Sequence, residues 1–322
     1  MLKILQIILA VIVLVILVYY YNEFKKDDYK RKYDKYDLIQ QFLLGNREIS
    51  LDKPFLWIHN DHQINSRKWE TFSDRNNFSL NQPYLHLCIK SIIKHCQDSF
   101  NVCLIDDNTF KRLIPDWNIT MNRLANPIKK HMRILGFTKL LYNYGGMLIP
   151  SSTVCLRDLY PMFKSGISKH GFFAIEGINR TNTSVLKRFL PSYRTMGCIK
   201  HNTKMKEFIE FLTDLVYTDY TNEIDFTGEV NKWLFQKSLV KHITLLDGKT
   251  IGLKTIDDKE VFLNDLISSH YIEYDKRKLY AIVFQGDEIL KRTNLQWFSV
   301  LSKDKVLSAD TMISNHLLIS LN

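Results

Sequence analysis

The stretch Tyr144-Gly145-Gly146-Met147-Leu148-Ile149-Pro150-Ser151-Ser152 separates a helical pattern from a strand-like one. Ahead of it, apolar side chains recur at helical spacing from Pro127 onward, and paired glycines are a common helix stop. Behind the glycines, Met147 to Ile149 are apolar residues that suit a short buried strand. The stretch therefore predicts a helix over residues 127–144, a strand over 147–149 and a polar turn after it.

The flanking sequence repeats this alternation of strands and helices. Strands are predicted at residues 54–58, 101–105 and 172–175, and helices at 85–96, 205–219 and 230–239. Such alternation is typical of an α/β protein with a mainly parallel sheet and helices on both faces. Ligands of these sheets collect at the carboxyl ends of the strands, which here are residues 59–62, 106–107 and 150–152.

The amino-terminal segment is apolar over Ile4 to Val18 except for Gln6, and three tyrosines follow it. This length and composition predict an N-terminal transmembrane helix and a single-pass membrane protein, with the lipid bilayer as a partner. Six basic residues follow the span and place the large domain on the cytosolic side. Four Asn-x-Ser/Thr triplets would matter only in a secretory lumen; they begin at Asn77, Asn118, Asn179 and Asn182.

Four segments are expected along the chain. Residues 1–22 are the anchor, and residues 23–50 are a charged stalk with an amphipathic helix. Residues 51–246 are the main α/β domain. After Asp247, short strand-like pieces and a final apolar helix-like stretch predict a C-terminal subdomain or wrapping tail over 247–322.

Composition narrows the function classes. The 322 residues carry a net charge of +10, which favours phosphate-bearing partners but does not choose between sugar nucleotides, lipid heads and nucleic acid. Five cysteines without metal-ligand spacing are expected to be reduced thiols. No GxSxG, P-loop, GxGxxG or HExxH motif occurs, so hydrolase, NTPase, dinucleotide-binding and zincin classes lack support.

Three segments in order resemble one enzyme family. KLLYNYGGMLIPSSTVCLRDLYPMF, KPFLWIHNDHQINSRKW and VCLIDDNTF are similar to the central motif, the first strand and the second strand of Asp-x-Asp glycosyltransferases of the glycosyltransferase-32 and capsular-polysaccharide-synthesis type. The resemblance covers roughly residues 53–163. It implies a GT-A-like fold and transfer of a sugar from a nucleoside diphosphate donor to a glycan acceptor.

The resemblance also implies Mn²⁺ or Mg²⁺ held by Asp-x-Asp, but Pro150 and Ser152 stand at the two acidic positions. The family's Asp-x-x-Arg falls on Ile134 and Phe137. Arg133 lies one helical turn before Phe137, so it is the nearest substitute for the lost arginine. No metal ligand is therefore assigned, and the cofactor stays unknown.

Candidate site residues follow from the strand ends and from this motif. The expected donor-binding residues are Trp57, His59, Asp106, Asp107, Arg133, Tyr144, Gly145, Gly146, Ser151 and Ser152. Asp61 and His62 join His59 as a conceivable cation set, against the plainer reading of a solvated loop. Lys129, Lys130 and Arg133 could neutralise a diphosphate without metal, although such a run is usually a solvated face. Asp225 and Glu229 are weak catalytic candidates, expected in a glycine-containing loop before a helix, where capping is the plainer role.

Two functions remain open at this point. One is a membrane-anchored glycosyltransferase-like protein that binds a nucleotide-sugar and transfers the sugar. The other is a non-catalytic membrane-associated scaffold, for instance of a viral or organelle envelope, because both acidic motifs of the donor site are lost. Nucleic acid is not an expected partner, since no reading helix or aromatic platform is evident.

Overall fold

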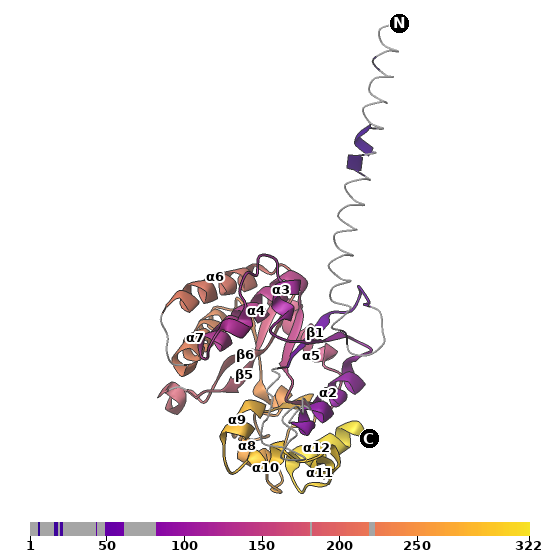
Figure 1. Cartoon of the computed structure of the whole chain (residues 1–322), viewed down its shortest axis with the longest axis vertical. Helices are drawn as coiled ribbons and strands as arrows, with labels where there is room; N and C mark the ends of the chain where they lie inside the picture. The colour runs from indigo at the N-terminus through magenta and orange to yellow at the C-terminus, as the bar shows by residue number, and fades with distance from the viewer. Residues whose placement is uncertain are drawn as a thin grey trace, which may run out of the picture. The chain divides into compact units, whose positions relative to one another are not determined.

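The computed structural model describes residues 49–60, 82–180, 182–218 and 223–322, together with residues 6, 16–18, 20, 21 and 43. The chain divides into two units, Met1–Ile49 and Ser50–Asn322. The second unit holds the strands and helices described below (Figure 1).

The N-terminal prediction needs correction. Among the described residues, no helix combines the length and the apolarity that a membrane span requires. Only Gln6 and residues 16–18 of the expected span belong to this part of the chain, and the rest of the span and nearly all of the stalk lie outside it. The predicted transmembrane helix, and the single-pass cytosolic placement built on it, are therefore withdrawn.

A six-stranded sheet forms the centre of the second unit, in the order β2-β1-β3-β6-β5-β7. The strands are β1 (Phe55–His59), β2 (Asn101–Ile105), β3 (Gly146–Pro150), β5 (Phe172–Ile178), β6 (Phe189–Cys198) and β7 (Thr244–Leu246). β1 pairs in parallel with β2 and β3, and β5 with β7, while β6 is antiparallel to both β3 and β5. Five strands thus run one way and β6 the other, which confirms the predicted α/β class with a mostly parallel sheet.

Helices cover both faces of this sheet. Consecutive strand residues point to opposite faces. On β5, Phe172 meets Phe208 of α6 (Thr203–Tyr217), with ring centroids 6.2 Å apart, and Phe173 packs so closely on α5 (Tyr160–His170) that Gly166 has no room for a Cβ. α4 (Ile128–Tyr144) packs on α6, and α7 (Glu223–Leu239) packs on β6.

The helix-to-strand junction depends on its two glycines. Gly145 has φ 72°, and its amide closes α4 on the Leu141 carbonyl at 2.7 Å. Gly146 has φ 100°, and a Cβ there would stand 2.1 Å from the Phe55 carbonyl oxygen, because β3 starts directly beside β1. Only glycine fits both requirements of this position, a positive φ and contact with a neighbouring backbone.

The C-terminal quarter of the chain contributes to a second core rather than forming a set of strands. Within residues 247–322, the expected strand-like pieces contain β8 (Ala281–Val283), which pairs antiparallel with β4 (Thr153–Cys155), while DGKTIG forms a 3₁₀ turn capped by Asp247. Short helices pack with α2 (Pro83–Cys96) at one end of the sheet (Figure 1). These are α8 (Leu263–Leu266), α9 (Gly286–Lys291), α10 (Gln296–Ser299), α11 (Lys303–Ser308) and α12 (Met312–Leu321).

The five cysteines are all buried and none forms a disulfide. Cys96 and Cys155 come nearest to each other, with their sulfur atoms 3.7 Å apart. Burial raises the pKa of Cys88, Cys103 and Cys198, so these thiols stay protonated and pack as small apolar groups.

Candidate functional site

A cleft of about 540 Å³ opens at the carboxyl ends of β3 and β5. Pro150 ends β3 on one side, and Glu176 to Ile178 end β5 on the other. The antiparallel strand β6 crosses the floor, and the first turns of α7 and α9 form the walls. This is the edge of a parallel sheet at which ligands are expected.

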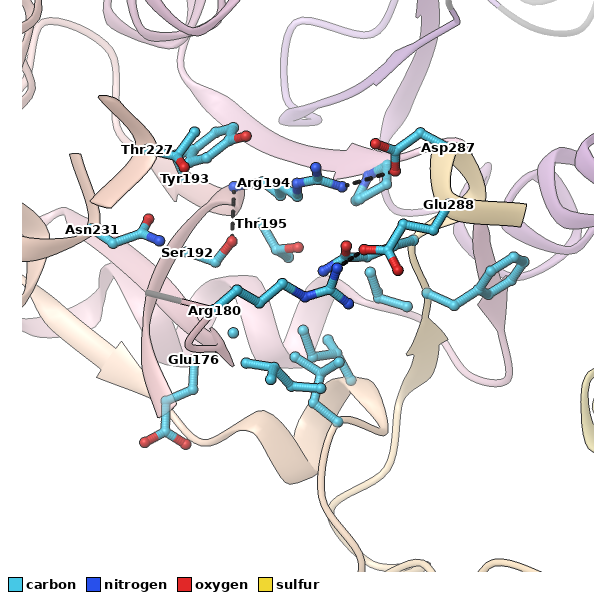
Figure 2. A pocket seen from close by; sticks show the side chains of 18 of the residues that line it. Glu176, Arg180, Ser192, Tyr193, Arg194, Thr195, Thr227, Asn231, Asp287 and Glu288 are labelled. Atoms are coloured by element: carbon cyan, nitrogen blue, oxygen red, sulfur yellow. Dashed lines mark hydrogen bonds and ion pairs between the residues drawn. The ribbon is translucent and has the colours of Figure 1, made fainter. Parts of the chain in front are cut away.

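Charged side chains gather along the α9 wall of the cleft. Arg194 of β6 places Nη1 3.4 Å from Oδ1 of Asp287, and Lys291 lies 3.7 Å from Oδ2 of the same carboxylate. Glu288 is shared in the same way between Arg180, which follows β5, and Arg292, whose Nη2 lies 2.6 Å away. Figure 2 shows the carboxylates of Asp287 and Glu288 turned toward the guanidinium groups of Arg194 and Arg180.

This group of six side chains, named here the α9 cluster, holds four cations and two carboxylates. The two further lining carboxylates have lysine partners of their own. Lys254 pairs with Glu176, and Lys130 lies 2.7 Å from Glu223. The α9 cluster therefore carries an excess of two positive charges at the wall of a cavity, which favours an anionic ligand.

The pKa shifts of Asp287 and Arg180 also indicate an excess of positive charge at this wall. Burial raises the pKa of Asp287, but the positive charges of Arg194 and Lys291 outweigh burial and hold that pKa below its usual range. Burial, followed by the charges of Arg194 and Arg292, lowers the pKa of Arg180. Arg180 is therefore crowded by other cations, and an added anion would relieve this repulsion.

The opposite wall offers neutral polar groups. Thr227 and Asn231 of α7 line the cleft, and the Thr227 hydroxyl donates to the Glu223 carbonyl at 2.9 Å. The Oδ1 atom of Asn231 is buried and has no hydrogen-bond partner among the described residues. A buried acceptor without a partner is costly, so a hydroxyl of a bound ligand would stabilise it.

The predicted donor residues of β1, β2 and α4 form a different cluster. Asp107 is 8% exposed and accepts two hydrogen bonds from Arg133, at 2.6 and 2.7 Å. His59 Nε2 lies 3.1 Å and Lys129 Nζ 3.2 Å from the same carboxylate. Burial raises the pKa of Asp107, but the hydrogen bonds from His59 and Arg133 hold it well below its usual range. This Asp107 cluster saturates its carboxylate internally, and none of its members lines the cleft.

Other predicted donor residues serve the fold. Asp106 holds the turn that leads into α3 (Thr109–Leu113), where its Oδ1 accepts a hydrogen bond from the Thr109 amide at 2.9 Å. Trp57 is fully buried and donates its ring N–H to the Gly145 carbonyl at 2.9 Å. The Tyr144 hydroxyl donates to the Leu113 carbonyl at 2.7 Å. Gly145 and Gly146 form the junction described above. Asp61 and His62 lie outside the described residues.

The Pro150 to Ser152 loop does not fit a divalent cation. Pro150 lines the cleft but has no donor atom in its side chain. Ser152 is buried, its hydroxyl donates to the Phe284 carbonyl at 2.5 Å, and it does not line the cleft. Ser151 adds a hydroxyl where Mn²⁺ or Mg²⁺ would need carboxylate oxygens. No group of three His, Cys, Asp or Glu side chains suited to a metal ion occurs in the described part of the chain.

The sequence suggested that the two weak catalytic candidates lie in a loop, but they lie in a helix. Asp225 and Glu229 both lie inside α7, which begins seven residues earlier than predicted. The sequence Glu223-Ile224-Asp225 supplies two acidic residues to the first helical turn, where their negative charges interact favourably with the helix dipole and stabilise the helix. Asp225 is exposed, and Glu229 lies 3.4 Å from Lys232 of the same helix. Neither lines the cleft.

Sequence reasoning missed every charged member of the α9 cluster. Its members come from three distant segments, and β6 was not predicted because Pro191 and Gly197 interrupt its strand pattern. One signal was available in the sequence, the segment GDEILKR at residues 286–292. In it, each of two adjacent acids is followed four residues later by a base, and a short apolar strand precedes the segment.

No family model matches the chain, and no curated protein matches it in sequence. Two solved structures are similar in part. The apo form of the glycosyltransferase GlyE from Streptococcus pneumoniae TIGR4 is 11% identical, with a TM-score of 0.36 over 61% of this chain and 46% of GlyE. The apo structure of WbbM, a bifunctional glycosyltransferase, is 11% identical, with a TM-score of 0.45 over 85% of this chain and 50% of WbbM. The chain thus matches about half the length of each.

Proposed function

We propose that the cleft binds the diphosphate of a nucleotide-sugar without a divalent cation, and that the protein is a glycosyltransferase-like enzyme on a GT-A-like fold. The observation that carries this proposal is the α9 cluster, whose four cations and two carboxylates line a cavity at the carboxyl ends of β3 and β5. A nucleotide-sugar diphosphate carries about two negative charges, which match the excess of positive charge. The Tyr-Gly-Gly motif and its flanking strands, which occur in the same order along the chain as in the glycosyltransferases that it resembles, also support this proposal.

The proposed reaction is the transfer of the sugar to an acceptor hydroxyl, with a glycan as the expected acceptor. The bond between the anomeric carbon and the diphosphate oxygen breaks, and the electron pair leaves with the nucleoside diphosphate. A new bond forms from the anomeric carbon to the acceptor oxygen, whose proton passes to a base. Arginine and lysine at the cleft wall would stabilise the negative charge that builds on the leaving diphosphate.

Calorimetry of the full chain tests donor binding. UDP- and GDP-sugars are titrated in EDTA and, separately, in MnCl₂. The expected result is binding in EDTA that manganese does not strengthen. Arg194→Met should weaken binding by roughly 10- to 100-fold, the value of one or two charge-assisted hydrogen bonds. Arg123→Met removes an exposed arginine outside the cleft and is the matched control. No heat with any donor would refute the proposal.

A turnover assay separates catalysis from binding alone. The absence of a metal-ligand loop at Pro150 to Ser152, and the position of Asp225 and Glu229 outside the cleft, favour a non-catalytic protein as the second candidate. Release of free nucleoside diphosphate from a bound nucleotide-sugar, with or without added glycans, would establish the enzyme. Tight binding with no release under any condition would favour the non-catalytic alternative.

A further inference from the structure

The two carboxylates of the α9 cluster are bound in the same way. Each carboxylate lies between two cations. One cation comes four residues later in the chain, at the end of α9, and the other comes from a different element of the cleft. Asp287 lies between Lys291, four residues on, and Arg194 of β6. Glu288 lies between Arg292, four residues on, and Arg180, which follows β5. The cleft thus contains two neighbouring cation pairs, and each pair already holds one anionic group.

The exposure of these side chains shows which part a ligand can reach. The Glu288 side chain is 10% exposed, whereas those of Arg180 and Arg292 are each 40% exposed. Arg194 and Asp287 are 34% and 36% exposed. All three arginines line the cleft and keep a third or more of their side chains exposed, as does Asp287, and only Glu288 is nearly enclosed.

The backbone that carries the carboxylates is held in place. A Cβ on Gly286, the first residue of α9, would stand 3.0 Å from the Tyr84 hydroxyl and 3.1 Å from Ser152 Cβ. The helix start therefore packs against α2 and the loop after β3. Because the start of α9 is held in place, we expect an exchange of anions at this wall to involve the side chains of Asp287 and Glu288 rather than a movement of the helix.

We propose that Asp287 and Glu288 occupy the positions of the two phosphates of a diphosphate ligand, which displaces them on binding. The proposal rests on the use of this cleft by a nucleoside diphosphate compound, as argued above. A diphosphate replaces both carboxylates at once and joins both cation pairs through one molecule. A monophosphate only exchanges one carboxylate for one phosphate. The two acids therefore set the affinity of the site and its preference for diphosphates.

The charges that face α9 from other elements are compatible with this exchange. Lys130 of α4 contributes to the positive charge around Asp287, and Glu223 of α7 holds Lys130 at 2.7 Å. Glu176 is held by Lys254 and by the Gly248 amide at 3.0 Å. These carboxylates have cations of their own, so they do not replace Asp287 and Glu288 once a ligand displaces them.

Calorimetry with inorganic pyrophosphate, inorganic phosphate and UDP, all in EDTA, tests the proposal on the full chain. Glu288→Gln leaves Arg180 and Arg292 without their carboxylate. Pyrophosphate should then bind at least ~5-fold more tightly than to the wild type, and phosphate should gain at least as much, because the freed cation pair accepts a single anion. Glu207→Gln is the matched control, since Glu207 also lies between two cations, Lys204 and Lys237, but outside the cleft.

Each outcome of these titrations either supports or refutes the displacement of Asp287 and Glu288 by a diphosphate, or refutes the proposed function. Glu288→Gln that is folded and binds pyrophosphate no better than the wild type, or a Glu207→Gln variant that gains equally, overturns the proposal. If Glu288→Gln does not fold, Asp287→Asn carries the same expectation through Arg194 and Lys291. A wild type that ignores nucleotide-sugars while Glu288→Gln gains pyrophosphate affinity would refute the proposed function alone. Binding of nucleotide-sugars without any gain in the variants would refute this inference alone.

Discussion

The Asp107 cluster and the α9 cluster use the same kinds of groups and differ in their surroundings. In the first, one carboxylate that is 8% exposed takes a two-point contact from Arg133 and further contacts from His59 and Lys129. In the second, two carboxylates share four cations at the wall of a cavity, and the arginines stay a third or more exposed. The two clusters therefore differ in access: the Asp107 carboxylate is enclosed by its partners, whereas the arginines of the α9 cluster stay partly exposed where they line the cleft.

Asp107→Ala should have the largest effect on stability. It removes the carboxylate that Arg133, His59 and Lys129 share, and breaking a buried ion pair costs about 3–5 kcal/mol. Urea unfolding followed by circular dichroism measures the loss. A change below 1 kcal/mol would show that the Asp107 cluster is not a closed structural unit and would remove its contrast with the α9 cluster.

Ser152→Asp has the next largest expected effect and tests whether the loop after β3 can hold a metal ion. The Ser152 hydroxyl donates to the Phe284 carbonyl, so a carboxylate there would face an acceptor in a buried position, at a cost of about 2–4 kcal/mol. Ser151→Asp, at a half-buried position, is the control and should cost little. Unfolding with and without MnCl₂ is the measurement. Stabilisation of Ser152→Asp by manganese would show that the loop can turn its side chain toward the cleft.

The frame of the fold, unlike its site, could be predicted from the sequence. Residues 127–149 specify α4, the glycine junction and β3, because local spacing and positive-φ glycines act over short distances. Strand β6 escaped prediction because Pro191 and Gly197 weaken its pattern, and its place between β3 and β5 is decided by tertiary packing. Arg180, Arg194 and Glu288 come from three segments far apart in the chain, so no local pattern could have joined them.

Low pH should weaken the Asp107 cluster in a predictable direction. Because the folded-state pKa of Asp107 is depressed, its contribution is fully present above the ordinary Asp pKa of about 3.9 and is lost as the pH falls below it. The stability difference between the wild type and Asp107→Asn should therefore shrink by roughly 1 kcal/mol between pH 6 and pH 3. Urea unfolding at both values measures this. A difference that grows toward acid pH would contradict the assigned protonation state.

Arg194→Met should have the smallest effect on stability and so completes the contrast. Its contact with Asp287 is long, at 3.4 Å, and both side chains are about a third exposed, so solvent screens the pair. Exposed pairs of this kind contribute about 0–1 kcal/mol. Urea unfolding should therefore place Arg194→Met within 1 kcal/mol of the wild type, whereas its affinity for a nucleotide-sugar falls. A stability loss as large as that of Asp107→Ala would mean that the α9 cluster is also a closed structural unit. Its cations would then stabilise the fold and would not be accessible to a ligand.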